Sequence, residues 1–271
     1  MMDYINYIIL GIVQGISEWL PISSKTQIMI LSNILLNLDP SFSYILGLSL
    51  EFGSFFAVLI YLKRDLLEII KNKELTSFFL IATLFTALIG IPLYKLSKYF
   101  LTSYKINSEI LMSILGIALI INGMYIYISK KFLIENKDKI PNIKDAFIVG
   151  SIQALSVLPG VSRSGVTITT MLFLGYKPET AFKYSYILGA IAMLGSFVLV
   201  LLDLLFTKEV YNINEKVNFY GIIISFSTSI LISIITIDYI LKFARKAKVY
   251  LINFILGIII IIYSFVLLKY F

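Results

Sequence analysis

Ten apolar stretches follow one another along the chain, and their lengths repeat in a fixed order. In each half, two short stretches come before three long ones. The short stretches span residues 4–16, 28–38, 143–158 and 168–174, and the long ones span 44–62, 78–94, 110–128, 184–202, 219–237 and 249–268. A helix needs about 20 apolar residues to cross a bilayer. The pattern therefore predicts six transmembrane helices and two pairs of helices that are too short to cross.

Each short pair is interrupted by polar residues, and the interruption predicts a re-entrant helical hairpin. The first break falls within residues 17–27 and the second within residues 158–167. Non-helical backbone is tolerated at membrane depth only where it lines a cavity or is buried in protein. We therefore expect both breaks to face the interior of the fold.

Parts of the sequence itself also repeat, which indicates an internal duplication. The matching residues are Gly11, Gln14 and Ser17 in the first half and Gly150, Gln153 and Ser156 in the second, each set followed by Leu-Pro. We predict one integral membrane domain, residues 1–271, built from the halves 1–128 and 143–271. Because each half crosses three times, the second half is expected to lie inverted. The predicted fold class is an all-α polytopic membrane protein with an inverted-topology repeat.

Composition supports the membrane assignment and narrows the chemistry. The chain is 59% hydrophobic and 14% charged, and it has neither cysteine nor histidine. Disulfides, thiolate or imidazole metal ligands and a histidine base are therefore excluded. A metal would have to be a hard cation held by oxygen ligands.

The net charge of +7 is interpreted as a topology signal, and we expect no nucleic-acid partner. Thirteen basic residues fall on one side of the predicted spans: Lys63, Arg64, Lys71, Lys73, Lys130, Lys131, Lys137, Lys139, Lys144, Lys242, Arg245, Lys246 and Lys248. Six fall on the other: Lys95, Lys98, Lys105, Lys208, Lys216 and Lys269. The first side is predicted to be cytoplasmic, with both termini outside a cell membrane.

Arg163 is the most informative polar residue, because it lies within apolar sequence. An arginine at membrane depth costs about 2.5–3.5 kcal/mol on insertion scales, so it needs a partner. Ser162 and Ser164 are good N-caps for a helix that starts here. Free N–H groups at that start and the guanidinium fork suit a phosphate. The alternative is a capped loop with an arginine that reaches towards the membrane surface.

Glu18 lies in the first break and is expected to face Arg163. The run Ser23-Ser24-Lys25-Thr26 also opens a helix, so two hydroxyl-rich helix starts would converge and could grip a diphosphate. A serine there could attack phosphorus if a carboxylate takes its proton. The alternative is a structural ion pair that merely joins the hairpins.

These residues resemble the undecaprenyl-diphosphate phosphatase family of bacitracin-resistance membrane enzymes. Residues 159–167 look like its phosphate-binding signature, and residues 14–27 look like its other signature, Glu-x-x-x-Glu followed by Pro-x-Ser-Ser and a histidine. The resemblance covers nearly the whole chain. It implies hydrolysis of a polyprenyl diphosphate to the monophosphate carrier lipid and inorganic phosphate. It also implies a divalent cation (Mg²⁺ or Ca²⁺), an outward-facing site and a homodimer.

The resemblance also implies roles for individual residues. Glu18 is the second motif acid, Ser24 the nucleophile and Arg163 the phosphate clamp. Ser162, Ser164 and Thr167 are implied as supporting phosphate ligands. Beyond the resemblance, we predict further phosphate contacts for Ser23, Lys25 and Gly160, supporting roles for Gln14, Gln27 and Gln153, and cation binding by Glu18 and Glu51.

The sequence departs from the family pattern at four positions. Gln14 replaces the first motif glutamate, and Gln27 replaces the histidine. Lys25 stands where a small residue is usual, and Glu51 where glutamine is common. Our hypothesis is that Glu51 supplies the missing carboxylate and is catalytic, with Lys25 as an additional phosphate contact. The alternatives are a buried acid that only packs helices, or a catalytically weak protein.

Two other functions compete with hydrolysis. A carrier or flippase for a phosphorylated lipid would suit an inverted repeat and would tolerate the lost side chains. An inactive paralogue would bind the lipid without turnover. Release of inorganic phosphate from a polyprenyl diphosphate separates both from a phosphatase.

Overall fold

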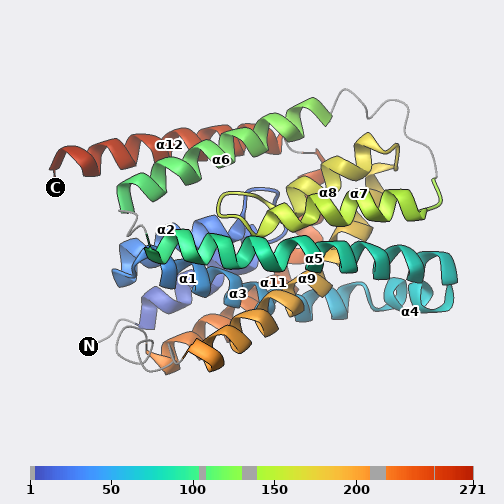
Figure 1. Ribbon diagram of the computed structural model, residues 1–271, viewed down its shortest axis with the longest axis horizontal. Coiled ribbons are helices and arrows are strands. Elements are labelled where there is room, and N and C mark those ends of the chain that lie inside the picture. Colours follow the sequence, from blue (N-terminus) through green and yellow to red (C-terminus); the bar gives the residue numbers. More distant parts are fainter. Residues whose placement is uncertain (1–3, 104–107, 130–138, 208–217, 247, 271) are drawn as a thin grey trace.

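The structure is a computed structural model that describes residues 4–103, 108–129, 139–207, 218–246 and 248–270. Within these ranges six helices are long and apolar enough to cross a membrane. They are α3 (Pro40–Tyr61), α5 (Lys73–Ser103), α6 (Ser108–Ser129), α9 (Pro178–Thr207), α11 (Phe219–Lys246) and α12 (Val249–Tyr270) (Figure 1). The predicted all-α polytopic fold is confirmed, and the chain is a multi-pass membrane protein.

The short helices fall where the sequence predicts them. They are α1 (Tyr4–Ser17), α2 (Ser24–Leu36), α7 (Ile143–Ala154), which continues into the 3₁₀ turn η2 (Leu155–Val157), and α8 (Arg163–Phe173). At 1.5 Å per residue, helices of this length reach about 16–21 Å, whereas the hydrocarbon core is about 30 Å thick. None of them can cross alone. The re-entrant path of the two hairpins stays a prediction.

Several helices are longer than the apolar stretches that predict them. The polar ends of α5 and α11 continue the helix beyond the apolar run, because backbone hydrogen bonding is not limited to hydrophobic residues. A further amphipathic helix, α4 (Lys63–Lys71), was not predicted, since its apolar residues are too few to form a run. Residues 130–138, which lie between the two predicted halves, are outside the described part.

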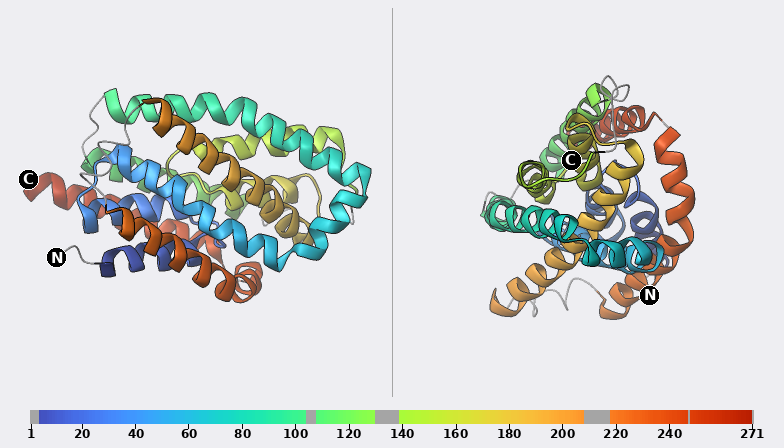
Figure 2. Two further views of the ribbon diagram at one scale, coloured as in Figure 1. Left: turned by 90° about the horizontal axis from the view of Figure 1, so that it is seen from below. Right: turned by 90° about the vertical axis from the view of Figure 1, so that its right-hand side faces the viewer.

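Helices from the two halves pack crosswise. α1 packs along α11, α7 packs along α5, and α6 lies beside α12. Figures 1 and 2 place the chain's N- and C-terminal ends at the same end of the molecule and α4 at the opposite end. This arrangement puts α4, with its basic residues Lys63, Arg64 and Lys71, far from the termini, as the predicted topology requires.

The central helices α3 and α9 share a sequence that is not among the predicted repeats. Ser43–Gly47 and Ser185–Gly189 both spell Ser-Tyr-Ile-Leu-Gly, and Gly-Ser-Phe follows at the same spacing in residues 53–55 and 195–197. α3 packs against α9, α2 packs on α3, and α8 packs on α9. The start of each hairpin's second helix is therefore seated on the repeated segment of its own half.

Candidate active site

The two polar breaks meet, and they are directly bonded to each other. The Gly160 N–H donates to Thr26 Oγ1 at 3.0 Å, and Ser23 Oγ donates to the Val161 carbonyl at 3.4 Å. Gly160 has φ +90°, a left-handed conformation that side chains rarely adopt, and a Cβ there would collide with Ala118. The turn of the second break is thus fixed by Gly160 and by the hydrogen bonds that the turn makes with Thr26 and Ser23 of the first break.

Each break leads directly into a helix. Ser162 caps α8, since its Oγ accepts a hydrogen bond from the Gly165 N–H at 3.2 Å. This is the capping that the sequence predicts. Ser23 precedes α2 with φ 60°, and its side chain bonds Thr26 Oγ1 at 2.8 Å instead of a backbone amide.

Two asparagines that the sequence analysis overlooked hold the first break in place. Asn122 of α6 and Asn253 of α12 donate to the Pro21 carbonyl at 3.0 and 2.8 Å. Asn122 also donates to Asn253 Oδ1 at 3.0 Å. A buried amide in a transmembrane helix is costly unless it is bonded. Asn122 and Asn253, each within an apolar run, could therefore have been recognised in the sequence as residues with a polar partner.

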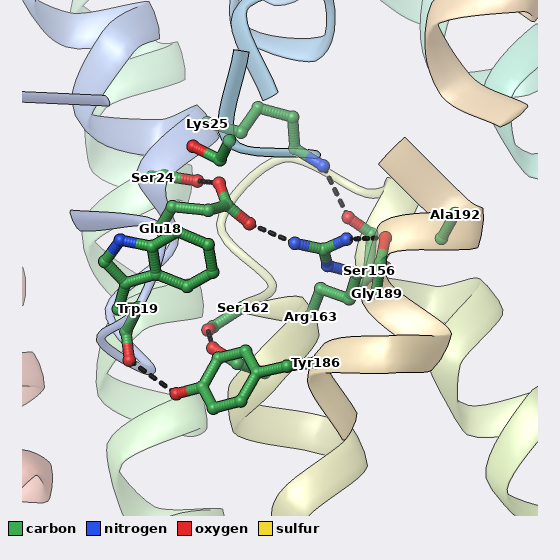
Figure 3. Close-up of polar contacts among 12 residues, drawn as sticks. Glu18, Trp19, Ser24, Lys25, Ser156, Ser162, Arg163, Tyr186, Gly189 and Ala192 are labelled. Carbon is green, nitrogen blue, oxygen red and sulfur yellow. Dashed lines mark hydrogen bonds and ion pairs between the residues drawn. The ribbon is translucent and has the colours of Figure 1, made fainter. Parts of the chain in front are cut away.

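Glu18 and Arg163 meet at the centre, as predicted, in a buried ion pair (Figure 3). Arg163 Nη2 bonds Glu18 Oε1, while Oε2 accepts from Ser24 Oγ at 2.6 Å and from Gln14 Nε2 at 2.7 Å. Both carboxylate oxygens are therefore satisfied, which a buried ion pair requires. Because a buried serine hydroxyl donates to a carboxylate, the geometry is that of a nucleophile with an adjacent base.

Gly189 provides the surface on which the guanidinium lies. Its carbonyl accepts from Arg163 Nη1, and a Cβ on Gly189 would lie only 2.9 Å from that nitrogen. A larger residue would push the guanidinium out of its position. Sequence analysis did not single out Gly189, although the repeated Ser-Tyr-Ile-Leu-Gly segment marks it.

Lys25 takes the corresponding place in the other half. Its Nζ donates to the Ser156 carbonyl and to the Val157 carbonyl, the latter at 2.9 Å. Gly47 lies beneath it, where a Cβ would be 3.0 Å from Lys25 Cγ. The predicted phosphate contact is thus bonded to backbone oxygens in this conformation, but its side chain still lines the site.

A pocket of only about 10 Å³ lies among these groups, enough for about one water molecule. Its lining residues are Glu18, Leu20, Ser23, Ser24, Lys25, Glu51, Ser156, Val161, Ser162, Arg163 and Ser164. The negative charges of Glu18 and Glu51 balance the positive charges of Lys25 and Arg163 in this pocket. A diphosphate can enter only if the ion pair or the lysine contacts open.

Glu51 reaches this pocket from α3. It is 8% exposed, and its carboxylate makes no hydrogen bond or ion pair with any other residue that the structure describes. An unpaired buried carboxylate is costly. Because Glu51 lines the pocket beside Glu18, Lys25 and Arg163, its carboxylate is placed to contact a ligand or a cation bound there.

Three other predicted residues lie away from the pocket. Thr167 bonds the Arg163 carbonyl at 2.8 Å, one turn along α8. Gln27 donates to the Ile22 carbonyl at 3.3 Å. Gln153 donates to Thr86 at 3.2 Å and lines a second cavity of about 240 Å³ between α5, α7 and α9, called the α5–α9 cavity below.

The sequence is similar to a known protein family and to named relatives. The family described as "Bacitracin resistance protein BacA" matches residues 7–262. The chain belongs to the BacA family. A protein named undecaprenyl-diphosphatase from Sulfurisphaera tokodaii is 42% identical over 264 residues, which cover 97% of this chain and 98% of the relative. A protein of the same name from Pyrobaculum aerophilum is 39% identical, over 93% of this chain and 94% of the relative.

Membership in the BacA family confirms the predicted family. It also makes Gln14 a replacement at the first acidic position of the family signature. Where the family signature has a first glutamate, the Gln14 amide donates to Glu18. A carboxylate there would face a second carboxylate. In this chain the first motif position therefore steadies the acid instead of adding a charge, while Glu51 adds one from another helix.

The oxygen ligands of the site limit how a divalent cation could bind. In the described residues no three histidine, cysteine or acidic side chains cluster as a metal site would require. Glu18 and Glu51 do line one pocket. Two carboxylates fit a hard cation only if phosphate oxygens complete its coordination, as is usual for Mg²⁺.

Proposed function

We propose that this protein is a membrane phosphatase that hydrolyses a polyprenyl diphosphate of the undecaprenyl type to polyprenyl phosphate and inorganic phosphate. The reaction would recycle a carrier lipid for envelope glycan assembly. The observation that carries the proposal is the buried contact of Ser24 with Glu18, which is itself paired with Arg163. The name shared by the relatives supports the same substrate.

In this mechanism Ser24 Oγ attacks the terminal phosphorus while Glu18 takes the hydroxyl proton. The bond from phosphorus to the bridging oxygen breaks, and polyprenyl phosphate leaves with the proton returned by Glu18. Water then attacks the phosphoserine, again giving a proton to Glu18. Glu18 gives this proton to Ser24 Oγ as the bond between phosphorus and Oγ breaks, so inorganic phosphate leaves and both residues return to their starting states.

Charge neutralisation supplies most of the catalysis in phosphoryl transfer. When the diphosphate enters, Arg163 exchanges part of its contact with Glu18 for a bidentate contact with phosphate oxygens, and Lys25 can turn to the second phosphate. A diphosphate adds negative charge to a pocket whose own charges already balance. A divalent cation held by Glu18 and Glu51 would offset that charge on the departing phosphate.

Phosphate release from long-chain polyprenyl diphosphate by purified protein tests the function. We expect Arg163→Ala to lower kcat by about 10²–10³-fold, the range for loss of a positioned electrostatic contact. Arg163→Lys keeps the charge but loses the fork, so a smaller loss is expected. The surface variant Arg64→Ala is the matched control and should retain wild-type turnover.

Folding must be separated from chemistry, because loss of Arg163 leaves a buried carboxylate unpaired. Each variant is therefore compared by thermal unfolding in detergent. Wild-type turnover in a folded Arg163→Ala protein would refute the proposed function.

A lipid carrier is the second candidate, and the crosswise packing of the two halves favours it. A carrier would bind and move the lipid without freeing phosphate. The same assay decides between them, since a folded wild-type protein that binds polyprenyl diphosphate but releases no phosphate is a carrier or an inactive paralogue.

We also propose that the site opens to the outer face of the cell membrane, that both termini lie outside and that the protein forms a homodimer. The excess of basic residues at the end that carries α4 supports the orientation. The homodimer rests on the family resemblance alone.

A further inference from the structure

The α5–α9 cavity is apolar and larger than the pocket that holds the charged groups. It has a volume of about 240 Å³ and is lined mainly by small and aliphatic side chains of α5 and α9. Gly90, Gly195, Val198 and Leu202 are among them. Apolar cavities in proteins do not attract water, so this space suits a hydrocarbon.

The cavity exists because equivalent helices pack differently in the two halves. Gly53 of α3 and Gly195 of α9 occupy the same place in the repeated segment. A Cβ on Gly53 would lie 2.7 Å from Ser229 Oγ of α11, whereas a Cβ on Gly195 would meet nothing within 4 Å. The contact between α3 and α11 is therefore closed, and its counterpart between α9 and α5 leaves a space.

The inner end of this space reaches the charged pocket. Ser156 lines both cavities, and its carbonyl accepts a hydrogen bond from Lys25. A molecule with a charged head at Arg163 and an apolar tail could therefore extend past Ser156 into the α5–α9 cavity.

The outer rim of the space faces the membrane. Ile91 of α5 and Val198 and Leu202 of α9 line it and are 41%, 45% and 45% exposed. All three belong to helices that are candidate membrane spans. A chain in the cavity could continue into the bilayer between these two helices without meeting polar surface.

We infer that the α5–α9 cavity holds the first part of the isoprenoid tail of the substrate, between its diphosphate and the bilayer. The inference rests on the proposed function for the identity of the head group. It assigns a specificity role to Gly195, because absence of a side chain there keeps the space open. The cavity would then select the isoprenoid tail by its width and apolar character in the part next to the diphosphate.

Gly195→Phe tests this assignment, since the ring would begin in open space and fill the cavity. Turnover is compared for a long-chain polyprenyl diphosphate and for dimethylallyl diphosphate, whose tail is one isoprene unit. We expect the ratio of long-chain to short-chain kcat/KM to fall about tenfold or more, the scale for loss of apolar pocket contacts. Leu194→Phe, on the exposed face of the same helix and outside the cavity, should leave that ratio unchanged.

A binding experiment separates failure of the tail site from failure of the proposed function. Native mass spectrometry of the full chain measures retention of polyprenyl phosphate by the wild type, Gly195→Phe and Leu194→Phe. Loss of retention only in Gly195→Phe supports the tail site even if no variant releases phosphate. Equal retention with an unchanged turnover ratio overturns it, as does selective loss of a bilayer phospholipid while polyprenyl phosphate remains bound.

Discussion

At the scale of single residues, the two cations of the site are held in the same way. Lys25 and Arg163 each follow a Leu-Pro pair at the same spacing, and they lie over Gly47 and Gly189 of the repeated segment. Their partners differ, because Arg163 pairs with an acid and Lys25 with backbone carbonyls. The chain thus has two equivalent cationic positions, and the Glu18 carboxylate is paired with only one of them.

Glu51 is predicted to be needed for turnover. Glu51→Gln removes a carboxylate that has no direct partner in the described residues, so the fold should tolerate it while phosphate release falls. We expect a loss of about 10²-fold, at the low end for removal of a catalytic acid or base. Phosphate release at saturating divalent cation measures it, and unchanged turnover would remove the compensating role of this residue.

A double substitution tests whether Glu51 compensates for Gln14. Gln14→Glu combined with Glu51→Gln moves the acid back to the first position of the motif. If the two positions are exchangeable, the double variant recovers activity that Glu51→Gln lost. Additive losses in the double variant would show that the positions are independent.

At the scale of helices, glycines decide how closely neighbouring elements approach. Gly53 allows α3 to reach α11, and its counterpart Gly195 faces open space. The same residue type at equivalent positions therefore has opposite structural consequences. Helix packing in membranes depends on such small residues at the contact.

Gly53→Ala and Gly195→Ala are predicted to change stability in opposite directions. At Gly53 the new methyl group overlaps the Ser229 side chain, so a loss of about 1–3 kcal/mol is expected. At Gly195 the methyl group is unobstructed, and alanine should stabilise the helix by about 0.5–1 kcal/mol. Thermal unfolding of both variants in one detergent measures this, and equal shifts would contradict the difference in packing.

Local sequence was sufficient to predict elements whose cause is local. The apolar runs predicted all six spans, and Ser162 was recognised as an N-cap because that role depends only on its neighbours. Gly189 was missed because its function depends on a close approach from another helix, whereas Asn122 was missed although a polar amide within an apolar span is visible in the sequence. α4 was missed for a different reason, since an amphipathic surface helix has no continuous apolar run.

At the scale of the whole molecule, the two halves hold each other's breaks. The Tyr44 hydroxyl donates to the Val157 carbonyl at 3.0 Å, and the Tyr186 hydroxyl donates to the Trp19 carbonyl at 2.7 Å. The two tyrosines are equivalent in the repeated segment, and both carbonyls directly precede a Leu-Pro pair. This reciprocity supports the proposed duplication and its inverted arrangement.

The predicted orientation can be tested directly because the chain has no cysteine. Lys71→Cys and Ser103→Cys place single thiols at opposite ends of α4 and α5. In intact cells a membrane-impermeant maleimide should label the second and not the first. The opposite pattern would reverse the proposed topology, and labelling of both after lysis is the control for accessibility.

The exchange of tyrosine contacts has a consequence for the ancestry of the enzyme. An isolated half would lack the hydroxyl that braces its own loop, so the pocket could form only after two copies had associated, as separate chains or as one fused gene. Once fused, the copies were free to diverge. The first copy could then keep Glu18. In the second copy, α9 could lose its close contact with the neighbouring helix, which left room for a lipid tail.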